Sequence, residues 1–423
     1  MKSRRYLFLP LLFAFSAVLS QNSTVSPYSR FGPGDLLFSG FSWQRAMGST
    51  GIAASPYGKF NYLNPAAYAG DTLMDFEFGL FGERLTKSQA EIQSTGLNAR
   101  LDYFSLAFPI VRNRMGIAIG FLPYSGTGYD VNTSAVLDSA NSMTTTYSGS
   151  GGVNRYFIST GLRVLPSLTI GLNAGYLYGS SDQSRSVDFS SDVFFDTRLK
   201  ETTTLSDFTF EAGVLWKLPV KTAANKFSLG ATFGIPSKVD GVRNAVWENY
   251  KKNGFGIPVV KDTILLKEDE RGNSVFPLQF GLGAQFSKGD QLILQADFRF
   301  QQWSSYSSFG ESTGNLKDSW RIAAGAQYQI DSKSPTYLKR VQYRAGVFHG
   351  ENFLMIRGQN LSETGVSFGF GLPMRKAFFS QISFGFEFGQ RGTLENDLVR
   401  ERYQRLVVGL SFNEFWFQKR RYD

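Results

Sequence analysis

Hydrophobic residues alternate with polar or small residues through most of the chain beyond position 70. In residues 72–80, Met74, Phe76 and Phe78 share one face of an extended backbone, and Asp75 lies on the opposite face. Successive side chains of a β-strand point to opposite sides of a sheet, so this alternation predicts strands with one apolar face. Segments of this kind predict an all-β fold of about fourteen antiparallel strands. They cover residues 72–80, 102–108, 115–122, 154–164, 168–178, 208–217, 227–233, 276–286, 292–300, 320–328, 341–347, 366–372, 381–388 and 405–412.

The lengths of the strands and of their connections favour a transmembrane barrel. Strands of roughly 9–13 residues are long enough to cross a bilayer at a tilt. The connections alternate between short ones, such as 111–114, and long ones, such as 126–152 and 235–273. Outer-membrane barrels have short periplasmic turns and long outer loops, whereas a soluble β-sandwich has no reason to alternate. We therefore expect a barrel in the outer membrane of a Gram-negative bacterium, with both termini periplasmic.

The face opposite the lipid is expected to line a lumen, and it carries glycines and charges. The glycines leave room for an inserted segment. Open sheet edges are costly in lipid, so the last strand must pair with the first and enclose these residues. The inward arginines either bind an anionic head group or pair with carboxylates such as Glu77 and Asp297. These candidate lumen residues are Arg155, Arg163, Arg299, Arg321 and Arg344.

The N-terminal part of the chain divides into two segments. Lys2, Arg4 and Arg5 precede an apolar run that ends before Gln21, which predicts a signal peptide over residues 1–20; an uncleaved anchor is the alternative. Residues 21–70 are rich in Gly, Pro, Ser and Asn, yet too apolar for a disordered tail. We expect this segment to be a plug inside the lumen, followed by the barrel over residues 71–423.

Composition excludes several kinds of chemistry. The chain has no Cys and one His among 423 residues, which excludes disulfides, a lipid-modified cysteine and multi-histidine metal sites. The formal charge of +9 includes the three basic residues of the signal peptide, and the other Lys and Arg residues are scattered. We therefore expect no metal, no cofactor and no nucleic-acid partner.

At Asn64-Pro65-Ala66 the chain resembles a known family. A plug-like segment that ends in an Asn-Pro-Ala turn and precedes about fourteen strands is similar to the FadL-type outer-membrane transporters of long-chain fatty acids and other hydrophobic molecules. Asn64 is a suitable N-cap and Pro65 a suitable first helical residue. The resemblance implies passive transport, a lumenal hatch and a lateral opening at the third strand. Pro123 lies there: it either opens the wall or simply ends the strand.

Three functional hypotheses remain. The first is passive transport of small hydrophobic or amphipathic molecules, and the second is an accessory barrel in an outer-membrane secretion or assembly machine. The third, a lipid-modifying enzyme, is disfavoured because the spacing of residues in the sequence identifies no serine that would pair with His349. The expected partners are outer-membrane lipid, a hydrophobic small molecule, and proteins at the outer loops. The long segment 235–273 either caps the mouth, contacts a partner or is a mobile loop.

Overall fold

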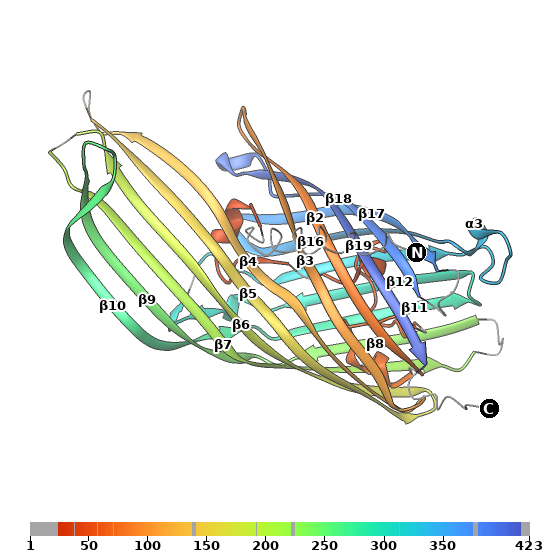
Figure 1. The fold of residues 1–423 in the computed structure, drawn as a ribbon. Helices are drawn as coiled ribbons and strands as arrows, with labels where there is room; N and C mark the ends of the chain where they lie inside the picture. The colour runs from red at the N-terminus through yellow and green to blue at the C-terminus, as the bar shows by residue number, and fades with distance from the viewer. Residues whose placement is uncertain are drawn as a thin grey trace, which may run out of the picture.

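The computed structural model describes residues 24–37, 39–56, 58–70, 72–137, 141–191, 193–220, 225–312, 314–374 and 380–415. These residues form a closed antiparallel barrel of fourteen wall strands, in which the last strand, β19, pairs with the first, β2 (Figure 1). The predicted signal peptide and both chain termini lie outside the described residues. None of the described helices has the length and apolarity of a membrane-spanning helix.

Sixteen labelled strands make up the fourteen-stranded wall, because two wall strands are interrupted. β8 and β9 are successive parts of one strand, separated at Ile235 and Pro236, and β10 and β11 are parts of the next, separated at Pro277. Proline lacks the amide hydrogen that a sheet ladder needs. The wall consists of β2 (Leu73–Gln89), β3 (Ile92–Val111), β4 (Met115–Val136), β5 (Ser142–Leu165), β6 (Leu168–Phe189), β7 (Asp196–Leu218), β8 (Asn225–Gly234), β9 (Ser237–Lys252), β10 (Pro258–Phe276), β11 (Gln279–Lys288), β12 (Leu292–Gln301), β15 (Ser319–Tyr328), β16 (Gln342–Ile356), β17 (Gln359–Pro373), β18 (Gln381–Arg391) and β19 (Arg400–Phe415).

The remaining elements lie inside the barrel or at its rims. The segment before β2 contributes η1 (Pro27–Arg30), β1 (Asp35–Leu36), α2 (Ser42–Arg45) and η2 (Pro65–Gly70). Beyond β12, the rims carry η3 (Trp303–Ser305), β13 (Ser307–Ser308), β14 (Glu311–Ser312), α3 (Tyr337–Arg340) and η4 (Glu395–Asp397).

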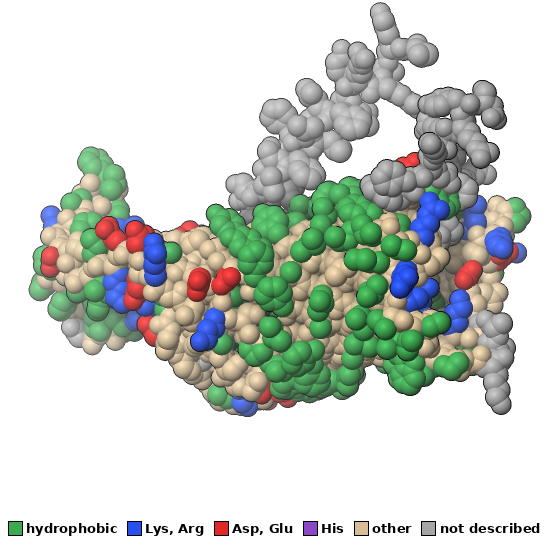
Figure 2. All heavy atoms as spheres, turned by 90° about the horizontal axis from the view of Figure 1, so that it is seen from below, with side chains coloured by type: hydrophobic (Ala, Val, Ile, Leu, Met, Phe, Trp, Pro, Cys, Tyr) green, Lys and Arg blue, Asp and Glu red, His purple; other side chains and the backbone are tan. Residues whose placement is uncertain are grey.

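The predicted alternation of inward and outward side chains is confirmed. On β2, Asp75 and Glu77 are buried inside the barrel, while Leu80 is exposed on its outer face. Hydrophobic side chains gather in a belt around the middle of the barrel (Figure 2), as a lipid-facing surface requires. The inward and outward assignments of the sequence therefore hold for the membrane-spanning part of the wall.

The prediction of long outer loops was wrong for three of the longest connections, whereas 304–318 and 390–402 contain little strand. Residues 235–273 belong mostly to β9 and β10, and the segments around 126–152 and 180–205 extend β4, β5, β6 and β7. These outer parts pair in the order β4, β5, β6, β7, β9, β10 and rise beyond the barrel on one side, forming what we call the outer blade (Figure 1). The blade lies beyond the apolar belt and carries many polar residues, so its strands lack the apolar alternation that marks the membrane-spanning strands.

The segment of residues 24–70 is enclosed by the barrel and touches it almost all round. Trp43, Phe41 and Phe60 are buried, and Phe41 packs edge-on against Tyr103 of β3. The backbone of the segment lies directly against wall glycines: a Cβ added to Gly346 would lie 2.2 Å from the Gly48 nitrogen. The glycine belt that contacts the plug, through its backbone or its side chains, consists of Gly116, Gly161, Gly171, Gly213, Gly230, Gly283, Gly325, Gly346, Gly369, Gly385 and Gly409.

Candidate functional site

The wall has a seam between β3 and β4. The two strands pair from Val111 and Met115 only as far as Phe104 and Phe121. Beyond this point β3 continues to pair with β2, and β4 continues to pair with β5. Pro123 lies just past the last β3–β4 pair, where a bulge interrupts the β4–β5 register. Because proline cannot donate to the ladder, this position favours the separation of the two strands.

A strand of the plug occupies part of the seam. In β1, Asp35 pairs with Gly126 and Leu36 pairs with Ser125 on the free edge of β4. The next amide, of Leu37, donates to the carbonyl oxygen of Tyr124 at 3.0 Å. We call residues 24–37 the plug arm; its residues 35–37 bond to the edge of β4 that β3 leaves free beyond Phe121.

Gly34 allows this close approach. Its φ is +96°, and a Cβ at this position would lie 2.6 Å from the carbonyl oxygen of Gly126. Both the left-handed backbone and the short distance exclude other residues.

An arginine from the barrel holds the plug arm in place. Arg391 on β18 forms ion pairs with Asp35 at 2.6 Å and with Glu401 on β19 at 2.7 Å. Ser26 of the arm donates to Glu401, and the Tyr28 hydroxyl donates to the Val399 carbonyl. Burial would raise the pKa of Asp35, but the attraction of Arg391 outweighs it and leaves that pKa below its ordinary value.

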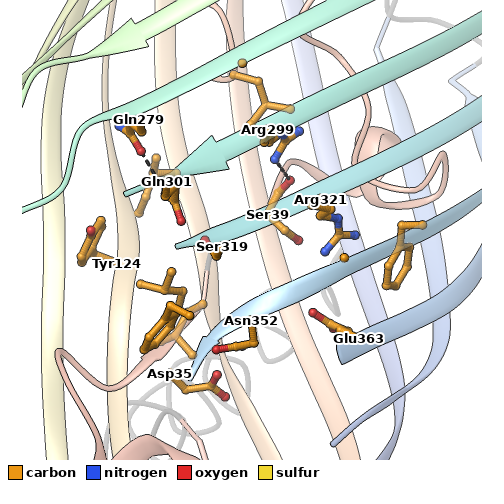
Figure 3. Close-up of a pocket in the computed structure, with 18 of the residues that line it drawn as sticks. Asp35, Ser39, Tyr124, Gln279, Arg299, Gln301, Ser319, Arg321, Asn352 and Glu363 are labelled. Carbon is orange, nitrogen blue, oxygen red and sulfur yellow. Dashed lines mark hydrogen bonds between the residues drawn. The ribbon is translucent and has the colours of Figure 1, made fainter. Parts of the chain in front are cut away.

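A cavity of about 310 Å³ lies between the plug and the wall, and it reaches the seam at Leu122 and Pro123. Its size is at the lower end of the range of small-molecule sites. The lining combines inward aromatic rings, including Tyr124 and Phe348, with polar side chains. Figure 3 shows Gln279, Gln301, Ser319, Asn352 and Glu363 around this cavity.

Two arginines lie opposite each other on neighbouring strands and line the cavity. Arg299 on β12 is the register partner of Arg321 on β15 (Figure 3). Like charges directly opposite each other destabilise a sheet. Among the described residues, Asp297 is the one carboxylate within ion-pair distance of either, 3.7 Å from Arg299. One oxygen of Asp297 already accepts the Gly51 amide at 2.7 Å.

The plug supplies backbone oxygens to the same pair of arginines. Arg299 donates to the carbonyl of Ser49, and Arg321 donates to that of Gly48 at 3.4 Å. The Arg321 guanidinium also lies 3.9 Å from the centre of the Phe348 ring. Carbonyl oxygens and a ring face balance a full charge only in part, and Glu363 on the same cavity is a nearby carboxylate beyond ion-pair distance, so the pair leaves part of its positive charge facing the cavity.

The other predicted lumen arginines have different surroundings. Arg155 lines the cavity but donates to Glu211 and to the Tyr62 hydroxyl, each at 2.8 Å. Arg344 is buried outside the cavity lining and donates to Gln327 at 2.9 Å. Arg163 lies near the short connection before β4, where its amide donates to the Arg114 carbonyl at 2.8 Å. The structure therefore brings three of the five arginines to one cavity and places two elsewhere.

The Asn64-Pro65-Ala66 turn joins the plug to the wall. The Asn64 side-chain oxygen accepts the amide of Ala66 at 3.0 Å and caps η2, in which Pro65 is the first residue. Its side-chain nitrogen donates to the carbonyls of Ile52 at 2.7 Å and Val214 on β7 at 3.0 Å. The turn thus has a structural role at this position, away from the cavity.

Sequence reasoning missed the partners of the few charged residues in the plug. Arg45 is buried and pairs with Asp102 at 3.2 Å and with Glu387 at 3.6 Å. Asp35 pairs with Arg391 as described above. Isolated charges in an otherwise apolar segment were a usable signal, because buried charges need partners.

His349 lies on the outer face of β16. Its Nδ1 atom is 2.7 Å from the Thr364 hydroxyl on β17, and its ring lies edge-on to Trp320 with 5.5 Å between centres. The partner seen in the structure is thus a threonine on the adjacent strand.

Known structures share the fold. The chain is similar to the CymD monoaromatic hydrocarbon channel, with 14% identity, a TM-score of 0.56, and coverage of 91% of this chain and 100% of that one. It is similar to a Pseudomonas aeruginosa FadL homologue at 13% identity, with a TM-score of 0.57 and coverage of 90% and 100%. It is also similar to the Pseudomonas putida toluene transporter TodX at 15% identity, with a TM-score of 0.58 and coverage of 91% of this chain and 100% of that one.

The predicted resemblance to FadL-type barrels is therefore confirmed at the level of the fold. No curated protein matches the chain. A family model described as BamG matches residues 2–423. The match extends over nearly the whole sequence, and the chain belongs to the BamG family.

Proposed function

We propose that the barrel binds small amphipathic molecules in its lumen and passes them laterally into the outer membrane through the β3–β4 seam. The observation that carries this proposal is the loss of β3–β4 pairing beyond Phe104 and Phe121, next to a cavity that reaches Pro123. The related solved structures include a hydrocarbon channel and a toluene transporter, which supports transport as the function. The proposed location is the outer membrane, where the barrel contacts lipid and both of its termini lie in the periplasm.

The arginine pair indicates the chemistry of the bound molecule. Arg299 and Arg321 would hold an anionic head group, and inward rings such as Tyr124 and Phe348 would contact an apolar tail. Hydrogen bonds to charged groups contribute about 1.5–3 kcal/mol each, and about 1.4 kcal/mol is a tenfold change in affinity. The variant Arg299→Gln/Arg321→Gln should therefore bind dodecanoate at least about tenfold more weakly, with dodecanol binding unchanged. Equal losses for both ligands would contradict a head-group role.

A disulfide between the plug arm and β4 tests the lateral route. The native chain has no cysteine, so Leu36→Cys/Ser125→Cys introduces a single pair. These residues are register partners, and cross-strand partners lie within the separation that a disulfide requires. Oxidation should reduce protein-dependent transfer of a fluorescent dodecanoate into proteoliposomes at least fivefold, and a reductant should restore it.

The matched control is Thr146→Cys/Ser186→Cys, a register pair between β5 and β6 away from the seam. Its oxidation should leave transfer unchanged. If the locked seam variant transfers the probe as fast as its reduced form, the lateral route is wrong.

A second candidate is an accessory barrel that supports an outer-membrane secretion or assembly machine. It is favoured by the plug, whose backbone and side chains pack against glycines on eleven of the labelled wall strands, since this fit leaves little space for a wide passage. Proteoliposomes separate the two candidates: a purified barrel that accelerates the transfer of no amphipathic probe favours the accessory function.

A further inference from the structure

The surface of the outer blade is apolar near the barrel, polar farther out and apolar again at its outer end. On β7, the exposed residues Phe208, Phe210 and Trp216 belong to the apolar belt. Farther out, residues 202–204 of the same strand are threonines. Beyond them, the turn between β6 and β7 exposes Val193, Phe194 and Phe195. Figure 2 shows the same order, with hydrophobic side chains in the central belt and again at the outer end of the blade.

The bilayer does not explain the apolar residues at the outer end. Asp196, where β7 begins, is twelve residues from Phe208. At about 3.3 Å per residue this is roughly 40 Å of strand, and about 30 Å of height at a tilt of roughly 40°. The apolar band of an outer-membrane barrel is only about 25 Å tall. These residues therefore lie in water, where such exposure usually marks an interaction surface.

Three neighbouring turns contribute to this surface, which we call the apical patch. The β6–β7 turn is joined to the β4–β5 hairpin by a hydrogen bond from the Ser190 amide to the Ser142 carbonyl at 2.9 Å. It is joined to the β9–β10 hairpin by Lys251, which donates to the Phe194 carbonyl at 2.7 Å. Phe255 is 91% exposed and Val193 83% exposed. The patch consists of Val136, Leu137, Val193, Phe194, Phe195, Phe255 and Ile257.

Strand addition is not the favoured mode of binding. β10 forms the outer edge of the blade, but its register with β9 shifts between Val260 and Asp262, between Thr263 and Leu265, and between Lys267 and Glu270. Bulges and charges at an edge strand prevent pairing with another chain. The edge of β10 is therefore closed to strand addition, and the apical patch offers a partner side chains in place of a strand edge.

The charge around the patch indicates the partner's chemistry. Lys251, Lys252 and Lys261 surround the β9–β10 turn, and Asp262 is the exposed acid beside them. Asp188, which pairs with Lys252 at 2.7 Å, is half-buried. The exposed acids Glu268 and Asp269 lie farther down β10, toward the barrel. Complementary charge at the rim guides recognition and rejects partners of like charge.

We propose that the apical patch docks a cell-surface protein whose contacting face is apolar and rimmed by acidic residues. Side chains such as Phe255 and Phe194 fill the centre of the interface, and the lysines contact the acidic rim. Large aromatic residues surrounded by polar contacts are typical of binding centres. This inference is independent of what the lumen carries.

Site-specific photo-crosslinking in living cells tests the proposal. A benzoylphenylalanine at position 255 of the full chain should give a discrete crosslinked protein, and one at Ile92, which is 76% exposed on the β2–β3 hairpin, should not. The decisive readout is charge dependence. The substitution Lys252→Glu/Lys261→Glu should reduce the yield at position 255 at least fivefold, whereas Arg84→Glu on β2 should leave it unchanged.

Three outcomes overturn the proposal. Crosslinks to lipopolysaccharide mean that the patch binds lipid, and crosslinks between two copies in the purified protein mean self-association. A crosslink whose yield does not respond to Lys252→Glu/Lys261→Glu contradicts the acidic rim. Unchanged heat-modifiable migration of each variant confirms that the barrel has folded.

Discussion

Gly346 shows how closely the plug and wall fit at the scale of single residues. A Cβ at this position would meet the Gly48 nitrogen at 2.2 Å and the Met47 carbonyl carbon at 2.3 Å, and neither backbone atom can rotate away. Overpacking of this kind costs about 1–3 kcal/mol. We expect Gly346→Ala to lower the apparent midpoint of thermal unfolding in detergent by several degrees.

Gly82→Ala is the matched control for this substitution. Gly82 lies on the wall strand β2, and a Cβ there would have no neighbour within 4 Å. Its midpoint should not fall. An equal fall in both variants would mean that contact with the plug is not the cause, since an effect through the unfolded chain would raise the midpoint.

Arg391 is expected to decide whether the plug arm stays at the seam. Arg391→Met would leave the buried carboxylates of Asp35 and Glu401 without their ion-pair partner. Removal of one member of a buried pair typically costs about 3–5 kcal/mol. A cysteine at Leu36 should then react with a membrane-impermeant maleimide at least tenfold faster than in the parent protein.

Arg357→Met provides the comparison, because Arg357 pairs with Asp397 at 3.6 Å on the exposed surface. Exposed pairs contribute little, so the labelling rate should stay the same.

The pH dependence of the plug arm has a defined sign. The pKa of Asp35 is lowered from 3.8, so its pair with Arg391 stabilises the arm above that pH and is lost as pH falls through the lowered value. In a Glu401→Gln background, a labelling rate that rises already at pH 6, relative to a free thiol at the same pH, would contradict this assignment.

The sequence predicted that inward arginines exist, but not which of them meet. Arg299 and Arg321 are opposite each other because β12 and β15 pair in one particular register, and β13 and β14 intervene between them along the chain. Alternation alone does not fix how two strands are aligned, because a shift by two residues keeps every side chain on the same face of the sheet. The same limit hid the pairing of Asp35 with Arg391.

At the scale of elements, the β9–β10 hairpin should be separable from the barrel. Arg243 and Glu270 are register partners, so the chain can be shortened between them. Nearer the barrel, β8 pairs with β7 and β11 pairs with β12, and these pairs close the wall without the hairpin. Replacing residues 244–269 with an Asn-Gly turn fits this geometry, because two-residue turns of this type connect paired strands. We expect unchanged heat-modifiable migration in gels and loss of the crosslink from a benzoylphenylalanine placed at position 194 of the apical patch. Failure of the shortened chain to form a barrel would show that the hairpin is needed for closure.

The membrane-spanning strands could be predicted and the blade could not, for one physical reason. Lipid selects apolar side chains at every second position, as at Phe208 and Phe210, and this produces a readable period. Water makes no such selection, so the run of threonines at 202–204 resembles a loop although it is a strand. The plug was recognisable by composition, but its path through the seam depends on pairing with β4 that no local pattern encodes.

At the scale of the whole molecule, the plug is expected to keep the lumen closed to ions. It fills the barrel from the glycine belt to the seam, with Phe41, Phe60 and Trp43 buried at its centre. Deletion of residues 24–70 should turn a barrel with no resolvable conductance in planar bilayers into an open channel. Gel migration without heating checks that the shortened chain forms a barrel, and equal conductance of both proteins would contradict the expectation.

The pairing of β19 with β2 has a consequence for the order of biogenesis. The residues that fill the interior are synthesised before any wall strand, and the strand that completes the cylinder is synthesised last. The filling is therefore available while the sheet curls, and because the finished wall encloses it on all sides, it is best gathered before the two edges meet. A chain that closed too early would trap an empty or half-filled cylinder, which makes the timing of edge joining a point at which a folding catalyst could act.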